Sequence, residues 1–257
     1  MINTNGVLAV MDHHITINWD DGPTMHRIAA QMRYHMPESA TLRTARINAS
    51  QRYSDDPLSF MTMGDGLRAS WIWQERGPGW TVQLGVTNEG EDDVYLDALD
   101  VIRVDYAFGG LFNLGAPPGL WRVLLEDVRG LLAAPAGGEN LSVELSEPTT
   151  AGWESWSPAT LTATGFTRRR CLIVQPVASN RSRPPAVMIR ALDADAPSSS
   201  ARTEIRLEVN GERFERLSAR YRTEGMLLGS GASMASPEFW VVSGDDAEEL
   251  RGLMVDE

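Results

Sequence analysis

The sequence predicts an all-β protein, built as a large antiparallel β-sandwich with a short C-terminal helix. Three observations lead to this prediction. Apolar residues recur mostly with a period of two, the candidate strands are short and closely spaced, and the segments between them are rich in Gly, Pro and Ser. Because few helical patterns separate these strands, alternating βαβ units are not expected.

The clearest strand lies at residues 81–88, where Val82, Leu84 and Val86 share one face. A polar stretch at 88–93 follows as a turn, so this strand is expected to begin a hairpin. The further candidate strands are residues 94–106, 141–145, 171–177, 186–192, 204–209, 213–217 and 239–242.

Segments rich in proline and glycine interrupt these strands, because they cannot continue a hydrogen-bonded ladder. They are residues 115–119, 134–138 and 196–200. The stretch 120–132 is apolar on nearly every side, and its periodicity fits a strand and a buried helix equally well.

A helix is predicted at the C-terminal end, with Ser243 as its cap and with Asp245 and Asp246 in its first turn. Leu250, Leu253 and Met254 form its apolar stripe. The helix has no stop signal, so we expect that further chain normally follows it. Leu253 and Met254 are therefore expected to be exposed, or covered by a neighbouring chain.

Composition and charge exclude several classes of function. The chain has 257 residues, 42% of them hydrophobic, and a net charge of −12, which disfavours binding to nucleic acid or to an anionic membrane. All 23 basic residues are arginine, so neither a P-loop lysine nor Schiff-base chemistry is available. The basic run at 168–170 is interpreted as a solvated turn. With no membrane-spanning run and no secretory leader, we expect a soluble, cytoplasmic protein.

The single cysteine and the four histidines give no metal site. Cys171 lies in an apolar run and is expected to be an inert buried thiol. The histidines are His13, His14, His26 and His35. On an extended segment the first two point to opposite faces, so they cannot share a metal ion. We therefore expect neither a metal nor a cofactor.

Tryptophan is the unusual residue, with eight copies. Trp71 and Trp73 would share one face of a strand and are expected to fill the core. Trp153 and Trp156 lie in a stretch bracketed as a loop by a glycine and a proline, where exposed indole rings could stack on sugar rings. The candidate residues for substrate binding or for the rim of a sugar site are Trp153, Glu154, Ser155, Trp156 and Ser157.

The segment 152–158, Gly-Trp-Glu-Ser-Trp-Ser-Pro, resembles the G-[WY]-Q-S-W-S motif in the N-terminal domain of glycoside hydrolase family 36, which contains α-galactosidases and raffinose-synthase relatives. Residues 80–105 resemble the strand, turn and strand that precede this motif. Residues 226–254 resemble the closing strands and the start of the helix that leads into the catalytic barrel. Glu154 stands where the family usually has glutamine, and residues 109–130 have no counterpart.

This resemblance implies a β-supersandwich domain, similar to galactose mutarotase, at residues 1–243. A helix at 244–257 would lead toward a catalytic (β/α)₈ barrel that this chain lacks. In the family, two aspartates of that barrel catalyse a retaining reaction, one of them in a K-W-D segment. Because the chain has no lysine, it lacks that segment, and no aspartate here inherits a catalytic role.

The function implied is therefore that of a non-catalytic N-terminal domain of an α-galactosidase-like hydrolase. It would support the barrel, oligomerisation and the rim of the sugar site, and would meet galactosides only through the parent enzyme. The alternative is a free-standing carbohydrate-binding β-sandwich. A mutarotase-like enzyme ranks last, because it needs histidines late in the domain and none lies beyond His35.

Overall fold

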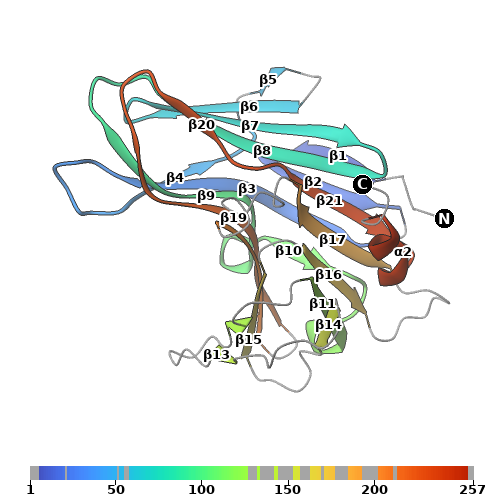
Figure 1. Ribbon diagram of the computed structural model, residues 1–257. Coiled ribbons are helices and arrows are strands. Elements are labelled where there is room, and N and C mark those ends of the chain that lie inside the picture. Colours follow the sequence, from blue (N-terminus) through green and yellow to red (C-terminus); the bar gives the residue numbers. More distant parts are fainter. Residues whose placement is uncertain are drawn as a thin grey trace.

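The computed structural model describes residues 6–20, 22–50, 52–54, 58–126, 132–133, 142–143, 153–156, 163–168, 171–176, 185–192, 202–210 and 213–253. These residues form two large sheets, and every described strand pairing is antiparallel (Figure 1). The first sheet runs in the order β1 (Gly6–Met11), β2 (His14–Trp19), β3 (Thr24–His35), β9 (Val94–Asp105), β19 (Arg213–Leu228), β18 (Thr203–Asn210) and β15 (Ala163–Arg168), with β4 (Arg43–Ile47) and β10 (Leu111–Asn113) also paired to β3. The predicted all-β sandwich is therefore confirmed.

The second sheet contains the remaining described strands, apart from one short pair. Its order is β14 (Trp153–Trp156), β11 (Trp121–Glu126), β16 (Cys171–Pro176), β17 (Ala186–Ala191), β21 (Phe239–Gly244), β8 (Gly79–Asn88), β7 (Leu67–Arg76), β6 (Leu58–Gly64) and β5 (Arg52–Ser54), with β20 (Ser233–Ala235) on β8. A small separate ladder pairs β12 (Leu132–Ala133) with β13 (Ser142–Val143). Two 3₁₀ turns, η1 (Tyr106–Phe108) and η2 (Pro118–Leu120), flank β10.

The main core lies between the two sheets, where alternate residues of facing strands are buried. Trp71 and Trp73 are fully buried there, and their rings meet edge to face at 5.5 Å. The indole N–H of Trp71 donates to the carbonyl of Val101, 3.0 Å away, in the opposite sheet. The prediction that this pair fills the core is confirmed.

A second apolar cluster covers the other face of the second sheet. The C-terminal helix, α2 (Ala247–Gly252), packs there against β16, β17 and β21, at the right of Figure 1. Leu250 is fully buried in this cluster. Cys171 is buried in it as well, as predicted for an inert thiol.

Most of the strands predicted beyond residue 80 are present within a few residues of their expected ends. The stretch 120–132, for which strand and helix were both open, contains the strand β11. Of the predicted strand at 141–145, the structure describes Ser142–Val143, which form β13, and the other three positions lie outside the described residues. The prediction for 213–217 was too short, because β19 continues to Leu228.

The interpretation of His13 and His14 as neighbours on one extended segment was wrong. Asp12 and His13 have φ values of 47° and 64°, and they form the two-residue turn that joins β1 to β2. A turn with positive φ at both central residues matches the twist of a hairpin, and Asp tolerates that conformation better than most residues.

The predicted cap of the C-terminal helix was also wrong. Ser243 still pairs with Val187 in the sheet, so β21 continues to Gly244. Asp246 is the cap, and its side chain accepts a hydrogen bond from the backbone N–H of Glu249 at 2.9 Å. The division of the chain at residues 243 and 244 stays a prediction.

The two residues expected to be exposed on this helix have different outcomes. Leu253 is partly buried and packs against the cluster beneath α2, whereas Met254 lies outside the described residues.

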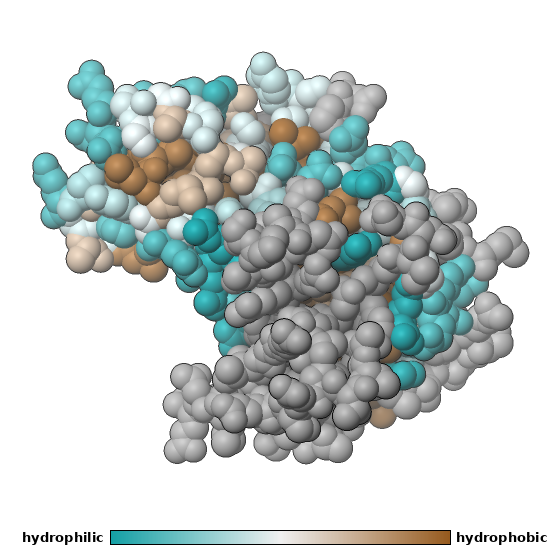
Figure 2. Space-filling model, in the orientation of Figure 1, coloured by the Kyte–Doolittle hydropathy of each residue, from teal (hydrophilic) through white to brown (hydrophobic). Residues whose placement is uncertain are grey.

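No described helix has both the length and the hydropathy to cross a bilayer. On the face drawn in Figure 2, described residues are largely hydrophilic, with an apolar patch at the upper left, where Figure 1 draws the far ends of β9 and β19.

Candidate functional site

The predicted sugar-site segment is a strand rather than a loop. Residues Trp153–Trp156 form β14, which pairs with β11 in the register Trp156 to Val123 and Trp153 to Glu126. The flanking glycine and proline suggested a loop, but the aromatic residues between them favour extended backbone that can join a sheet. Ser157 lies outside the described residues, and a role in sugar binding stays a prediction for all five residues.

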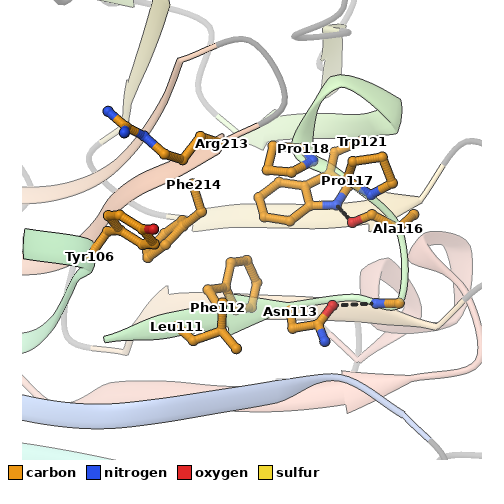
Figure 3. Close-up of a pocket in the computed structure, with 11 residues that line it drawn as sticks. Tyr106, Leu111, Phe112, Asn113, Ala116, Pro117, Pro118, Trp121, Arg213 and Phe214 are labelled. Carbon is orange, nitrogen blue, oxygen red and sulfur yellow. Dashed lines mark hydrogen bonds between the residues drawn. The ribbon is translucent and has the colours of Figure 1, made fainter. Parts of the chain in front are cut away.

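A pocket of about 520 Å³ lies next to this part of the second sheet, between β10, η2, β11 and the start of β19. A volume of this size suits a small ligand. Its described lining is mostly aromatic and proline side chains (Figure 3). These residues are Tyr106, Leu111, Phe112, Asn113, Gly115, Ala116, Pro117, Pro118, Trp121, Arg213 and Phe214.

Three buried rings form the floor of the pocket. Phe112 meets Trp121 edge to face at 5.4 Å and Phe214 at 6.1 Å. The indole N–H of Trp121 donates to the carbonyl of Ala116 at 2.9 Å, which fixes the ring against the η2 segment. Because the rings hold one another through oriented contacts, the floor is preorganised.

The turn η1 supplies the exposed wall. Asp105, the last residue of β9, accepts a hydrogen bond from the N–H of Ala107 at 3.1 Å, and Gly109 ends the turn with a φ of 75°. This turn leaves the Tyr106 side chain 48% exposed, beneath the Arg213 guanidinium at 5.3 Å from the ring centroid. Arg213 Nε also donates to Glu215 at 2.7 Å, so its charge is already compensated.

The pocket offers ring faces and polar edges but few groups that could move a proton. Among its described lining residues there is no histidine, aspartate, glutamate or cysteine. General acid–base catalysis depends on such a group within hydrogen-bond reach of the reacting atom. The described lining is therefore suited to binding an uncharged ligand.

Charged groups instead concentrate on the face of the first sheet that is turned away from the core. On β19, Arg216, Ser218, Arg220 and Arg222 alternate with residues of the core-facing side. Opposite them, β9 and β18 place the carboxylates that pair with these arginines. We call this set the arginine–carboxylate network: Arg33, Asp100, Arg103, Asp105, Glu204, Glu208, Arg216, Arg220 and Arg222.

Asp100 is the centre of this network and is completely buried. It pairs closely with Arg220, and it lies 3.3 Å from Arg103 and 3.7 Å from Arg33. Burial alone would lower the pKa of Arg220, but the hydrogen bond to Asp100 and the charges of Asp100 and Glu204 raise it. Asp100 therefore holds three arginines together at the centre of this face.

Asp105 has a similar role at the end of β9. It lies 2.7 Å from Arg103 and 3.2 Å from Arg216, with 5% of its surface exposed. Burial would raise its pKa, but the hydrogen bond from Arg103 and the charges of Arg216 and Arg103 outweigh this and hold the pKa below its ordinary value. A carboxyl that loses its proton so readily is a poor general acid at neutral pH.

The histidines are dispersed. His26 Nδ1 lies 3.4 Å from the hydroxyl of Thr16, and His35 Nδ1 lies 3.0 Å from Asp97. Within the ranges that the structure describes, no three His, Cys, Asp or Glu side chains are grouped to hold a metal ion.

Sequence reasoning did not find the residues of this pocket. They come from two stretches that are far apart in the sequence, 106–121 and 213–214, and each ring taken alone has the pattern of a core residue. One signal was present: residues 109–130, which contain the Pro117–Pro118 pair and Trp121, are the part without a counterpart in the family that the sequence resembles.

Comparison with known proteins gives structural neighbours only. No protein-family model and no curated protein matches the chain. A galactose mutarotase-like protein from Lactobacillus casei ATCC 334 shares 10% identity and a TM-score of 0.55, over 93% of this chain and 100% of that one. The chain therefore has the fold of a galactose mutarotase-like β-sandwich.

The other matches include enzymes that are much longer than this chain. The GH36 alpha-galactosidase AgaB from Geobacillus stearothermophilus matches over 83% of this chain with 14% identity and a TM-score of 0.47. A putative aldose 1-epimerase from Escherichia coli K12 matches over 75%, with 14% identity and a TM-score of 0.45. The chain spans about 30% of the alpha-galactosidase, in its N-terminal region. The predicted sandwich fold is the one that the chain shares with the galactose mutarotase-like protein.

Proposed function

We propose that this chain is a non-catalytic β-sandwich domain of an α-galactosidase-like glycoside hydrolase. In that role it supports a catalytic barrel, contributes to oligomerisation and lends the segment 153–157 to the rim of the sugar site. The galactoside is then the substrate of the parent enzyme. The single observation that carries this proposal is the pairing of the buried carboxylates with arginines.

Retaining hydrolysis uses two carboxyl groups that face each other across the scissile bond, one protonated and one free to act as the nucleophile. The buried carboxylates Asp100, Asp105 and Glu204 do not suit either role. Each is bound by at least two arginines, and the pKa of Asp105 is lowered, whereas that of a general acid must be raised. The ion pairs of these three carboxylates therefore support a structural role for them and a non-catalytic role for the domain.

The position of β14 supports the assignment of a rim. In the described pairing β14 is the terminal strand of the second sheet, hydrogen-bonded on one side to β11. A terminal strand presents unpaired backbone groups on its outer side, and these groups favour contact with a further segment or domain. This edge is where we expect the barrel to meet the sandwich.

The decisive experiment is an assay of the purified chain with aryl α-galactosides, with an active α-galactosidase as the positive control. We expect no hydrolysis above background. Turnover that persists through a second, orthogonal purification would overturn the proposal. A Glu154→Gln variant would then show whether the predicted rim segment carries the activity.

Single truncations of the two rim tryptophans test the rim. The two variants, Trp153→Ala and Trp156→Ala, should have unequal effects. One should lower the free energy of unfolding by about 3 to 5 kcal/mol, and the other should lower it by less than about 1 kcal/mol. This inequality is expected if one indole anchors the segment and the other is presented to a ligand. Equal and large losses, measured by urea unfolding, would favour a purely structural role for both.

The aromatic pocket favours one alternative, a free-standing carbohydrate-binding protein. Ring faces such as that of Tyr106 can stack on a sugar, and the described lining is uncharged apart from Arg213. Titration calorimetry with galactose and raffinose separates the two functions. Weak or absent binding agrees with the domain proposal, whereas tight binding that is lost in Tyr106→Ala would support the alternative.

A further inference from the structure

Two arginines on the outer side of the first sheet have no carboxylate partner among the described residues. They are Arg27 of β3 and Arg46 of β4. Both are exposed, and both contact Phe108 of η1. Arg27 Nη1 donates to the carbonyl of Phe108 at 3.4 Å, and the guanidinium of Arg46 lies over the Phe108 ring, 4.9 Å from its centroid.

These two contacts place two positive charges around one residue. Arg27 passes close to Gly109, where a Cβ would lie 2.8 Å from Arg27 Nη1 and would force the guanidinium to shift. The Phe108 side chain is itself 54% exposed, so the guanidinium stacked on it borders solvent. The arrangement is therefore built by the turn and open to a ligand.

No described carboxylate forms a direct ion pair with Arg27 or Arg46, although the charge of Asp105 acts to raise the pKa of Arg46. Asp105 acts on Arg46 only at a distance, because its oxygens are already bonded to Arg103 and Arg216. Burial lowers the pKa of Arg46, and the nearby charges of Arg103 and Arg27 lower it further. The pair is thus held in an environment where a further anion would relieve repulsion between cations.

His14 is in the same environment. Burial lowers its pKa, the charges of Arg46, Arg27 and His13 act in the same direction, and the charge of Asp12 opposes them with the smallest effect. Its Nδ1 atom is buried without a hydrogen-bond partner in the described part of the chain. A buried polar atom without a partner is unusual, because such atoms nearly always have one.

We propose that Arg27 and Arg46, held around Phe108, form a binding site for an oxyanion, that is, for a carboxylate, sulfate or phosphate group. A guanidinium presents its donors in a planar fork that matches these groups, and two such forks can bind one anion from two sides. The chain as a whole has a net charge of −12 and repels anions, so binding of an oxyanion would depend on this local pair of arginines. The inference does not depend on the proposed function.

The test uses the full chain and titration calorimetry at constant ionic strength, with chloride as the background anion. Four ligands are compared: inorganic phosphate, sulfate, galacturonate and, as the uncharged reference, galactose. We expect saturable binding of at least one oxyanion and no binding of galactose at this site. Binding of galacturonate alone would identify a sugar acid as the source of the group, and binding of the inorganic ions would identify a free anion.

Substitutions then locate the site. Arg27→Gln and Arg46→Gln should each weaken binding by at least about tenfold, and the double variant should abolish it. Arg251→Gln is the matched control, since Arg251 is paired with Glu248 on α2, and its affinity should equal that of the wild type. Both site arginines are exposed, so the variants should fold, and their thermal midpoints verify this.

A second variant keeps both charges and changes only their placement. Phe108→Leu removes the ring beneath Arg46 and should weaken binding by several-fold. The proposal is overturned if the wild type binds none of the oxyanions, or if the double variant binds them as the wild type does. The latter result would indicate an adventitious ion only.

Discussion

The outer faces of the two sheets are stabilised by different interactions. On the first sheet, the arginine–carboxylate network covers β9, β18 and β19 with charges. On the second sheet, an apolar cluster that includes Cys171, Trp240 and Leu250 lies beneath α2. The network region of the first face therefore depends on ion pairs between arginines and carboxylates, and the second face depends on the removal of apolar surface from water.

The difference predicts how each face responds to damage. Stabilisation by apolar burial is non-directional and roughly proportional to the buried area. Truncating one side chain therefore lowers the free energy of unfolding roughly in proportion to the apolar area that it buried. A buried carboxylate shared by several arginines is different, because its removal leaves cations without a counter-charge. Single substitutions should therefore cost more at the centre of the network than beneath the helix.

The largest effect is expected for Asp100→Ala. It would leave Arg33, Arg103 and Arg220 without their shared anion, and we expect a loss of about 3 to 5 kcal/mol in the free energy of unfolding. Urea unfolding measures this loss. The control is Asp97→Ala, since Asp97 pairs with His35 and its side chain is 34% exposed. Its cost should be below about 1 kcal/mol, and equal costs at the two positions would contradict the comparison.

The next effect is expected for Leu250→Ala beneath α2. Leu250 is fully buried, so its truncation leaves a cavity and should cost about 2 to 4 kcal/mol. The partly buried Leu253, which directly follows α2, offers a matched control, and Leu253→Ala should cost clearly less. If Leu250→Ala destabilises the protein more than Asp100→Ala does, the charged face is the weaker contributor and the comparison is reversed.

Strands in which apolar and polar residues alternate without interruption could be predicted from the sequence. In β8 the residues Val82, Leu84 and Val86 alternate without interruption, and all three are buried as expected. In β3 the phase changes: Met25 and Ile28 are buried three residues apart, residues 28–30 are all buried, and from there burial falls on every second residue. Arg27, with a φ of 55°, lies at this irregularity. A bulge shifts the pattern by one residue, and a period-two search therefore misses the strand.

The candidate sites were harder to predict, for a different reason. The pocket joins Tyr106, Phe112, Trp121 and Phe214, which approach one another only when β10 and β11 meet the start of β19. No local period records such an approach. The family resemblance identified the fold, but its motif drew attention to Trp153 and Trp156, and the structure describes only the backbone pairing of that segment.

The pH dependence of stability offers a smaller test of the network. The pKa of Asp105 is below its ordinary value in the folded chain, so its contribution is present above about pH 4 and is lost as the pH falls through the folded-state pKa. Asp105→Asn should therefore be less stable than the wild type at about pH 7, and the difference should shrink at about pH 3. Urea unfolding of both proteins at the two pH values measures it. A difference that is unchanged by acid would show that Asp105 contributes through packing rather than charge.

The smallest effect is expected at the cap of α2. Asp246 accepts from the N–H of Glu249, and the Glu249 carboxylate accepts from the N–H of Asp245, both at 2.9 Å, so two backbone donors are satisfied reciprocally. Asp246→Ala should cost about 1 kcal/mol, and Asp246→Asn less, because the amide oxygen can still accept. Ser243→Ala is the informative control, since a serine inside β21 has no capping role and its truncation should cost less than Asp246→Ala. Urea unfolding ranks the three variants. If Ser243→Ala proved the more damaging, the hydrogen bond of the Asp246 cap would contribute less to stability than the packing at the buried end of β21.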